Sequence, residues 1–207
     1  MLILVIGVLA PATAQATNLF QATAYPATIH GFAAWGNETI TTTGGTIQCA
    51  TAYHAELKEA STTLGLAPTY SECAAFGFIN STIHSNGCKY QLHVGEETAL
   101  DKFKSTFDVS CEAGKAIKVE AATCEVEVPA QSGLSSVALI DDTEATPKKD
   151  ITFQPNVTEL SLKVLKDGFG CPFSGTGSSK ASYHGGPTTL TGQNPSKAEE
   201  KIGVEVG

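Results

Sequence analysis

Six cysteines constrain this chain more than any other feature of its sequence. They are Cys49, Cys73, Cys88, Cys111, Cys124 and Cys171. In a chain that leaves the cytoplasm, an even number of cysteines favours three disulfides over free thiols. None of the six belongs to a Cys-x-x-Cys pair, which argues against a zinc knuckle or a thioredoxin-type site. We therefore expect a fold braced by three covalent cross-links.

The first sixteen residues, 1–16, have the form of a secretory signal peptide. An apolar run is followed by small residues at cleavage-site spacing, and cleavage after Ala14 or Ala16 fits the pattern. The usual positively charged leader is missing, and a buried N-terminal strand is the alternative interpretation. The run is too short to span a bilayer, as is every later apolar segment, so we expect no transmembrane segment. The predicted location is secreted or at the cell surface, with residues 17–24 as a flexible lead.

Alternating apolar and polar residues recur along the rest of the chain and predict strands. Ile47, Cys49, Thr51 and Tyr53 share one face of such a strand, which follows a predicted turn at Gly44-Gly45. Other strands are expected at 27–30, 38–42, 107–111, 117–119, 124–128, 136–140, 157–165, 181–184 and 202–206. A short helix over residues 97–106 is the one exception, because Leu100, Phe103 and Phe107 lie near helical spacing.

The clearest local signal is Asn86-Gly87, the dipeptide most typical of a tight hairpin turn. A hairpin centred on it pairs Ser85 with Cys88 and Ile83 with Tyr90. One face of this hairpin is then apolar and the other polar, so we expect it to be half-buried.

Many short strands, Gly-rich turns and almost no helical pattern predict an all-β fold. We expect an antiparallel β-sandwich, or a partly open barrel, that forms a single disulfide-linked domain over residues 25–207. Pairing neighbouring cysteines first favours Cys73–Cys88, Cys111–Cys124 and Cys49–Cys171 among fifteen possible connectivities. The long outer loop of that scheme ties the last third of the chain to the first.

Four features of the sequence carry a resemblance. They are the exported leader, residues 86–90, residues 124–129, and Cys171 with the later Ser182-Tyr183-His184-Gly185. Together they resemble a group of exported, cysteine-containing bacterial β proteins of unknown function. The similarity spans most of the mature chain, through loose motifs. It implies an extracytoplasmic, β-sandwich-like fold, and it implies no catalytic residue.

The charges of the chain exclude one class of function. The formal net charge is −8, and every basic residue is Lys. Arg is the side chain that grips phosphate and guanine edges in two places, so an acidic chain without Arg is unsuited to nucleic acid. We expect neither nucleic acid nor an anionic membrane surface as a partner.

Five histidines are candidate metal ligands: His30, His54, His84, His93 and His184. His84 and His93 share a face of the predicted hairpin, but about 13 Å separates them at about 3.4 Å per residue. No His-x-His or helical His-Glu-x-x-His spacing occurs. We therefore predict solvent-facing histidines, no metal and no cofactor.

Other candidates for chemistry are weak. In Ser182-Tyr183-His184 the imidazole has a hydroxyl beside it in sequence, but neighbouring strand residues point to opposite faces. Gly-x-Ser-x-Gly is absent, and the loop 175–179 lacks the spacing and the Gly-Lys pair of a phosphate loop.

Paired carboxylates are also candidates for catalysis, because glycosidases need two of them about 5 to 9.5 Å apart. The pairs considered are Glu96 with Glu97, Glu125 with Glu127, and Asp141 with Asp142 and Glu144. Glu125 and Glu127 alternate with the apolar residues Cys124, Val126 and Val128. A solvated strand face is therefore enough to explain the two carboxylates. The third group is also a candidate for calcium, although the EF-hand pattern is missing.

We expect Trp35, the single tryptophan, to lie in the core. The alternative is an exposed Trp35 that stacks against sugar or peptide. Glycosylation triplets begin at Asn37, Asn80 and Asn156.

The sequence favours an exported, non-catalytic binding or structural module, with a cell-surface glycan or protein as ligand. A secreted hydrolase acting on glycan or peptide is the alternative, and it requires the fold to assemble Glu125, Glu127, Asp141, Asp142, His84, His184 or Ser182 in one pocket. Protease inhibition through a braced loop is a third hypothesis.

Overall fold

The computed structural model describes residues 17–142, 149–168, 171–173 and 175–207. Every regular element in this part of the chain is a strand, and all strand pairs are antiparallel. The strands are β1 (Phe20–Ala22), β2 (Ala27–Thr42), β3 (Gly45–Leu57), β4 (Thr63–Ala75), β5 (Ile79–His84), β6 (Lys89–His93), β7 (Glu97–Ala99), β8 (Lys102–Ser110), β9 (Ala116–Ala121), β10 (Cys124–Pro129), β11 (Gln131–Asp142), β12 (Asp150–Asp167), β13 (Gly177–Gly185), β14 (Thr188–Asn194), β15 (Lys197–Ile202) and β16 (Val204–Val206). The prediction of an all-β antiparallel fold is confirmed. None of these described residues lies in a helix long and apolar enough to cross a lipid bilayer.

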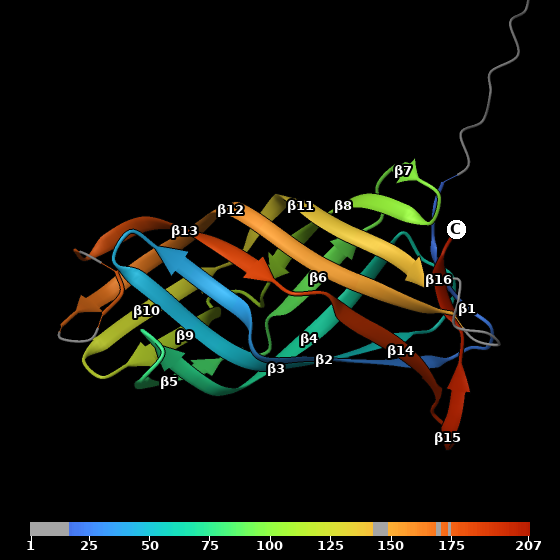
Figure 1. The fold of residues 1–207 in the computed structure, drawn as a ribbon, viewed down its shortest axis with the longest axis horizontal. Helices are drawn as coiled ribbons and strands as arrows, with labels where there is room; N and C mark the ends of the chain where they lie inside the picture. Colours follow the sequence, from blue (N-terminus) through green and yellow to red (C-terminus); the bar gives the residue numbers. More distant parts are fainter. Residues whose placement is uncertain (1–16, 143–148, 169–170, 174) are drawn as a thin grey trace, which may run out of the picture.

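Long strands build the main sheet (Figure 1). Four of them, β2, β3, β4 and β12, are continuous. Four others consist of two consecutive strands that lie end to end, namely β5–β6, β8–β9, β10–β11 and β13–β14. For example, β4 pairs with β6 through residues 63–66 and with β5 through Ala74 and Ala75, so β5 and β6 follow one edge of β4.

These eight long strands close into a barrel. Each pairs with the long strand before it and the one after it in the chain, and β13 and β14 pair back with β2, where Tyr183 lies opposite Ile40 and Thr191 opposite His30. This is an up-and-down barrel, an architecture without sheet edges. It replaces the expected β-sandwich, and it bears out the barrel of the alternative prediction, although this barrel is closed rather than partly open. Inward and outward residues alternate in both architectures, whereas closure depends on pairing between the first and last long strands, which no local pattern encodes.

Inward-facing side chains fill the barrel. In β8, the side chains of Phe103, Phe107 and Val109 are buried. Lys102 and Lys104, on either side of Phe103, are exposed. The buried apolar side chains of the described residues form one cluster. Each large apolar side chain in it contributes about 1.5–3 kcal/mol to the free energy of folding.

The Asn86-Gly87 turn forms, but the hairpin around it does not. Both residues have the positive φ that the turn requires, +51° and +79°. However, β5 pairs with β4 and β9, and β6 pairs with β4 and β8. The predicted pairing of Ile83 with Tyr90 is therefore wrong. Residues 85–88 are instead an insertion between two halves of one long strand.

The helix predicted over residues 97–106 is also wrong. This segment forms β7 and the first half of β8. Phe103 and Phe107 point inward from β8, because a spacing of four residues fits the two-residue period of a strand as well as a helical turn. Leu100, the third residue of the pattern, is exposed at the turn between the two strands.

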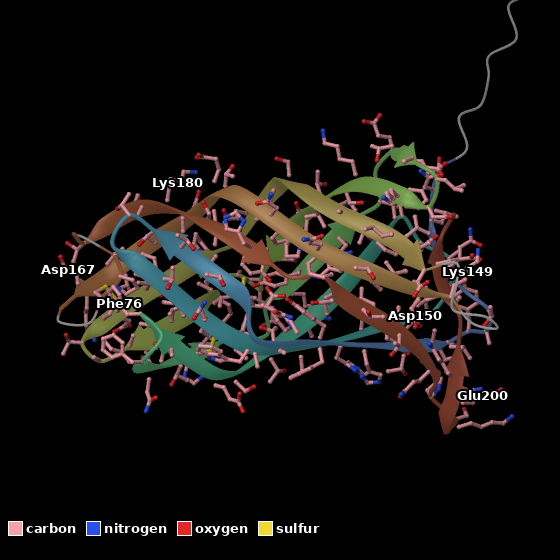
Figure 2. The ribbon with its side chains drawn as sticks, viewed as in Figure 1. Phe76, Lys149, Asp150, Asp167, Lys180 and Glu200 are labelled. Atoms are coloured by element: carbon pink, nitrogen blue, oxygen red, sulfur yellow. A yellow bond between two sulfur atoms is a disulfide. The ribbon has the colours of Figure 1, made fainter. Side chains whose placement is uncertain are left out.

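The segment predicted as a flexible lead, residues 17–24, contains β1, which pairs with β16 near the C-terminus (Figure 1). Phe20 of β1 is fully buried, and so is Val204 of β16. The lead is therefore anchored, and this two-stranded sheet covers one end of the barrel. Lys149 and Asp150 lie at the same end, and Phe76 and Asp167 at the opposite one (Figure 2).

Three disulfides join neighbouring long strands. The bonds are Cys49–Cys73, Cys88–Cys111 and Cys124–Cys171. The predicted pairing of Cys73–Cys88, Cys111–Cys124 and Cys49–Cys171 is wrong in all three bonds. It followed proximity in sequence, whereas the barrel brings together cysteines that are 23, 24 and 47 residues apart on adjacent long strands or the loops that follow them.

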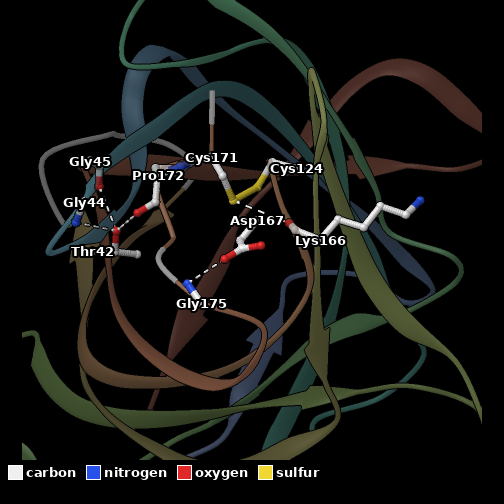
Figure 3. Close-up of a disulfide and its surroundings, with 9 residues drawn as sticks. All are labelled: Thr42, Gly44, Gly45, Cys124, Lys166, Asp167, Cys171, Pro172 and Gly175. Carbon is white, nitrogen blue, oxygen red and sulfur yellow. Dashed lines mark hydrogen bonds between the residues drawn. A yellow bond between two sulfur atoms is a disulfide. The ribbon is translucent and has the colours of Figure 1, made fainter. Parts of the chain in front are cut away.

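The Cys124–Cys171 disulfide holds residues 171–173 against the turn between β2 and β3 (Figure 3). The Thr42 hydroxyl donates a hydrogen bond to the Pro172 carbonyl and accepts one from the Gly44 amide at 3.2 Å. A Cβ atom at Gly44 would lie 2.7 Å from the Pro172 oxygen, so the close approach requires glycine. This contact covers the second end of the barrel.

Candidate functional site

The acidic residues considered for catalysis are dispersed. Glu125 and Glu127 lie on the outer side of β10, where Glu125 contacts Lys118 at 3.0 Å and also contacts Lys166. Hydrogen bonds from Lys166 and Lys118 hold the pKa of the Glu125 carboxyl below its usual range. A carboxylate kept ionised in this way is unsuited to donate a proton to a leaving group.

Asp141 stabilises the fold through hydrogen bonds with the backbone. It is buried, and its two oxygens accept hydrogen bonds from the Val206 amide at 3.0 and 3.1 Å. Burial raises the pKa of Asp141 to about 6, and the Val206 amide opposes that rise. Asp142 is exposed, and Glu144 lies outside the described residues. Within the described ranges, no three His, Cys, Asp or Glu side chains are grouped closely enough to hold a metal ion.

Two of the five histidines that were candidate metal ligands lie beside carboxylates. Nε2 of His84 is 3.7 Å from the Glu120 carboxylate, and Nε2 of His93 is 2.9 Å from that of Asp108. Their strands do not form the predicted hairpin, so the two imidazoles do not share one hairpin face.

On β13, Tyr183 points into the barrel, whereas Ser182 and His184 lie on the outer side. The imidazole of His184 and the phenol of Tyr183 are therefore on opposite faces of the sheet. The described structure does not assemble the serine, histidine and carboxylate candidates into one pocket.

A buried carboxylate and four tyrosines occupy the barrel interior instead. Tyr53 donates a hydrogen bond to Oε1 of Glu38 at 2.9 Å, and Tyr183 donates one to Oε2. The hydroxyl oxygens of these two tyrosines are 3.0 Å apart. Tyr70 and Tyr90 share a second hydroxyl hydrogen bond, and the Tyr90 ring centroid is 6.4 Å from that of Tyr53 and 5.9 Å from that of Tyr183. We call this group the Glu38–tyrosine cluster.

Burial dominates the electrostatics of this cluster. It raises the pKa of Glu38 to about 7, although hydrogen bonds from Tyr183 and Tyr53 act in the opposite direction. Burial likewise raises the pKa of each tyrosine, so the hydroxyls remain neutral donors.

The cluster has no room for a substrate. The gap beside it, lined in part by Tyr70, Tyr90 and Tyr183, has a volume of about 10 Å³. A single water needs about 10–15 Å³ on this measure. We therefore assign the cluster a structural role in the core.

Glu38 was not among the predicted site residues, although the sequence contains a signal for it. Two-residue periodicity places Glu38 on the same face as Ile40, which points inward from the predicted strand 38–42. The partners Tyr53 and Tyr183 are 15 and 145 residues away, so the pattern could identify an inward carboxylate but not what would stabilise it.

The outer side of β2 carries two exposed aromatic side chains. Phe32 is 64% exposed and Trp35 is 46% exposed. The expectation that Trp35 lies in the core is therefore wrong. The row of outward residues beside Phe32 continues with Ala52 on β3 and Thr69 on β4, whose small side chains leave the phenyl ring accessible.

A bulge in β2 explains the position of Trp35. The register with β3 shifts between Ala33 and Glu38, so residues 34–37 lie outside the regular ladder. Gly36 within it has φ +82°. The Asn37 carbonyl accepts a hydrogen bond from the Gly186 amide at 2.7 Å, which fixes the bulge against the junction of β13 and β14. Bulges commonly re-aim side chains in this way.

Two further histidines face each other near these aromatic residues. His30 of β2 lies directly opposite His54 of β3, and their Nδ1 atoms are 3.4 Å apart. The pairing of His30 with His54 was not predicted from the sequence, where only His84 and His93 were expected to share a face.

The described surface also has an open groove of about 480 Å³ beside β7 and β8. Its polar side chains include Lys102, Lys104, Gln154 and Asn156, and its lining contains neither histidine nor carboxylate.

Comparisons with protein-family models, curated proteins and solved structures found no match to this chain.

Proposed function

We propose that this protein is an exported, non-catalytic module that binds a neutral glycan through the outer side of β2. The observation that carries the proposal is the exposure of Phe32 and Trp35 on a barrel whose interior is filled. Export is supported by the three disulfides, which persist in oxidising compartments.

A binding role is favoured over hydrolysis because the polar groups able to do acid–base chemistry are separated. Glu125 lies in a surface ion pair, Asp141 accepts backbone hydrogen bonds, and Glu38 is enclosed by tyrosines. Acid–base catalysis needs such groups within hydrogen-bond reach of one bound substrate.

The aromatic pair supports a sugar as the ligand. Flat aromatic rings stack on the C–H faces of sugar rings, and Trp and Phe supply that area with few rotatable bonds. The bulge holds the backbone of Trp35 in place, so little conformational entropy is lost on binding. A net charge of −8 disfavours anionic polysaccharides.

The test is binding of the full chain to an array of neutral and acidic glycans. We expect binding to neutral glycans, and a loss of about tenfold or more for each of Phe32→Ala and Trp35→Ala, since a buried aromatic contact of about 1.4 kcal/mol corresponds to that factor.

Phe78→Ala is the matched control, because Phe78 is 79% exposed but lies at the turn between β4 and β5. We expect this variant to bind like the unmodified chain. The proposal fails if no neutral glycan binds, or if the three variants bind equally well. Binding only to protein ligands on a parallel protein array would also reject it.

A further inference from the structure

His30 and His54 form a cross-strand pair on the outer side of the barrel. Their Nδ1 atoms are 3.4 Å apart and their ring centroids 4.9 Å apart, so the Nδ1 edges of the two rings face each other. His54 is exposed and His30 is partly buried. No other histidines among the described residues are arranged in this way.

We propose that His30 and His54 bind a divalent transition-metal ion, with zinc as the reference case, through their two Nδ1 atoms and water. Zinc binds imidazole nitrogen at about 2.0–2.1 Å with tetrahedral geometry, which places two nitrogen ligands about 3.4 Å from each other. The observed separation is the one that such an ion requires. An ion can therefore enter without a movement of the backbone.

The bulge in β2 creates this pair. The register set by the β2–β3 turn, where Thr42 lies opposite Gly45, would place Ala33 opposite His54 if it continued without interruption. The extra residues of the bulge shift the register, and from Ala33 to Ala27 the ladder is again regular. The two imidazoles therefore project from a hydrogen-bonded ladder that fixes their Cα positions.

Binding of an ion by this pair depends on pH. A metal ligand must be an unprotonated nitrogen, so protons compete with the ion. In the absence of a metal, one Nδ1–H donates a hydrogen bond to the other Nδ1. An ion would bind both nitrogens once the donor imidazole carries its proton on Nε2 instead.

The remaining coordination positions face solvent. No third His, Cys, Asp or Glu joins the pair among the described residues, and Glu56, the next outward residue of β3, is 3.8 Å from the Lys58 amine. Water therefore completes the coordination, as in zinc sites that keep open positions. Imidazole ligands also suit Cu²⁺, which binds more tightly than Zn²⁺ in the general order of divalent ions.

The inference does not rest on the glycan proposal, because neither Phe32 nor Trp35 supplies a ligand. The experiment is calorimetric titration of the chelator-treated full chain with zinc chloride near neutral pH, repeated with copper chloride. We expect one ion per chain, tighter binding of copper, and loss of binding below about pH 5, where imidazole is protonated.

The variants His30→Gln and His54→Gln should each weaken zinc binding by at least about tenfold, the size of effect that even indirect changes around a metal produce. His184→Gln is the matched control, since His184 is an exposed strand histidine on β13. Far-ultraviolet circular dichroism verifies that each variant folds. Absence of binding by either ion would overturn the inference, and so would equal affinities for His30→Gln, His54→Gln and the unmodified chain.

Discussion

Burial and hydrogen bonding act in opposite directions on the pKa of Glu38. Enclosure in an apolar barrel disfavours the carboxylate, while the hydroxyls of Tyr53 and Tyr183 favour it. Burial prevails, and the pKa rises to about 7 from the ordinary value of 4.5. Because this pKa is higher in the folded chain than in the unfolded one, the folded state binds the proton more tightly. The contribution of Glu38 to stability is therefore complete below pH 4.5 and declines as the pH rises towards 7.

We expect the free energy of unfolding to fall with rising pH over this range, and Glu38→Gln to remove most of the fall. A shift of this size corresponds to about 3 kcal/mol for a buried group. Gln keeps the volume and can still accept a hydrogen bond. The measurement is urea unfolding at several values between about pH 4.5 and about pH 8, because the slope reports proton release.

Two variants separate this effect from others. Glu159→Gln changes an exposed carboxyl on β12, and we expect it to keep the slope of the unmodified chain. Asp141→Asn should remove a smaller part, since burial raises the pKa of Asp141 in the same direction. A Glu38→Gln profile parallel to that of the unmodified chain would contradict the assignment.

The strands and turns of the barrel show how much of this fold could be predicted from the sequence. Many strand positions followed from two-residue alternation, and the Asn86-Gly87 turn followed from its dipeptide. The strands β4 and β14 were not predicted. The partners of each strand did not follow, because local patterns do not encode which strands become neighbours. The bulge at residues 34–37 illustrates the loss: it sets the pairing of His30 with His54 and exposes Trp35, yet the sequence there only suggests a Gly-containing segment.

At the same scale, the turn between β2 and β3 depends on Gly44. We expect Gly44→Ala to reduce the free energy of unfolding by about 1–3 kcal/mol, because its Cβ would meet the Pro172 backbone and force residues 171–173 away. Gly65→Ala on β4 is the control. Its Cβ would lie 3.1 Å from the end of the Gln91 side chain, which can move, and in ordinary contact with the Lys89 side chain. Urea unfolding at constant pH compares the two variants, and equal losses would show that the contact at Gly44 does not matter.

The closed barrel joins distant parts of the chain through continuous pairing. The first long strand, β2, pairs with the last, β13–β14, and the three disulfides lie between other neighbours. No disulfide therefore crosses the pairing that closes the barrel. Closure depends on hydrogen bonds and on the packing of the core, including the contact of Tyr183 with Glu38 across β13 and β2. The disulfides act instead by restricting the unfolded chain.

This arrangement predicts that the barrel unfolds as one unit, with or without its disulfides. Near-ultraviolet circular dichroism reports on the four clustered tyrosines, and far-ultraviolet circular dichroism reports on the strands. We expect both signals to change at the same urea concentration, as in a two-state transition.

Replacing both Cys124 and Cys171 by Ala should lower the unfolding free energy by about 4 kcal/mol. Replacing both Cys49 and Cys73 by Ala should lower it by about 3.5 kcal/mol, since this disulfide encloses the shorter loop. Both signals should still coincide in each variant. Separate transitions would mean that the strands near the missing disulfide unfold independently, and the single domain predicted over residues 25–207 would then be wrong.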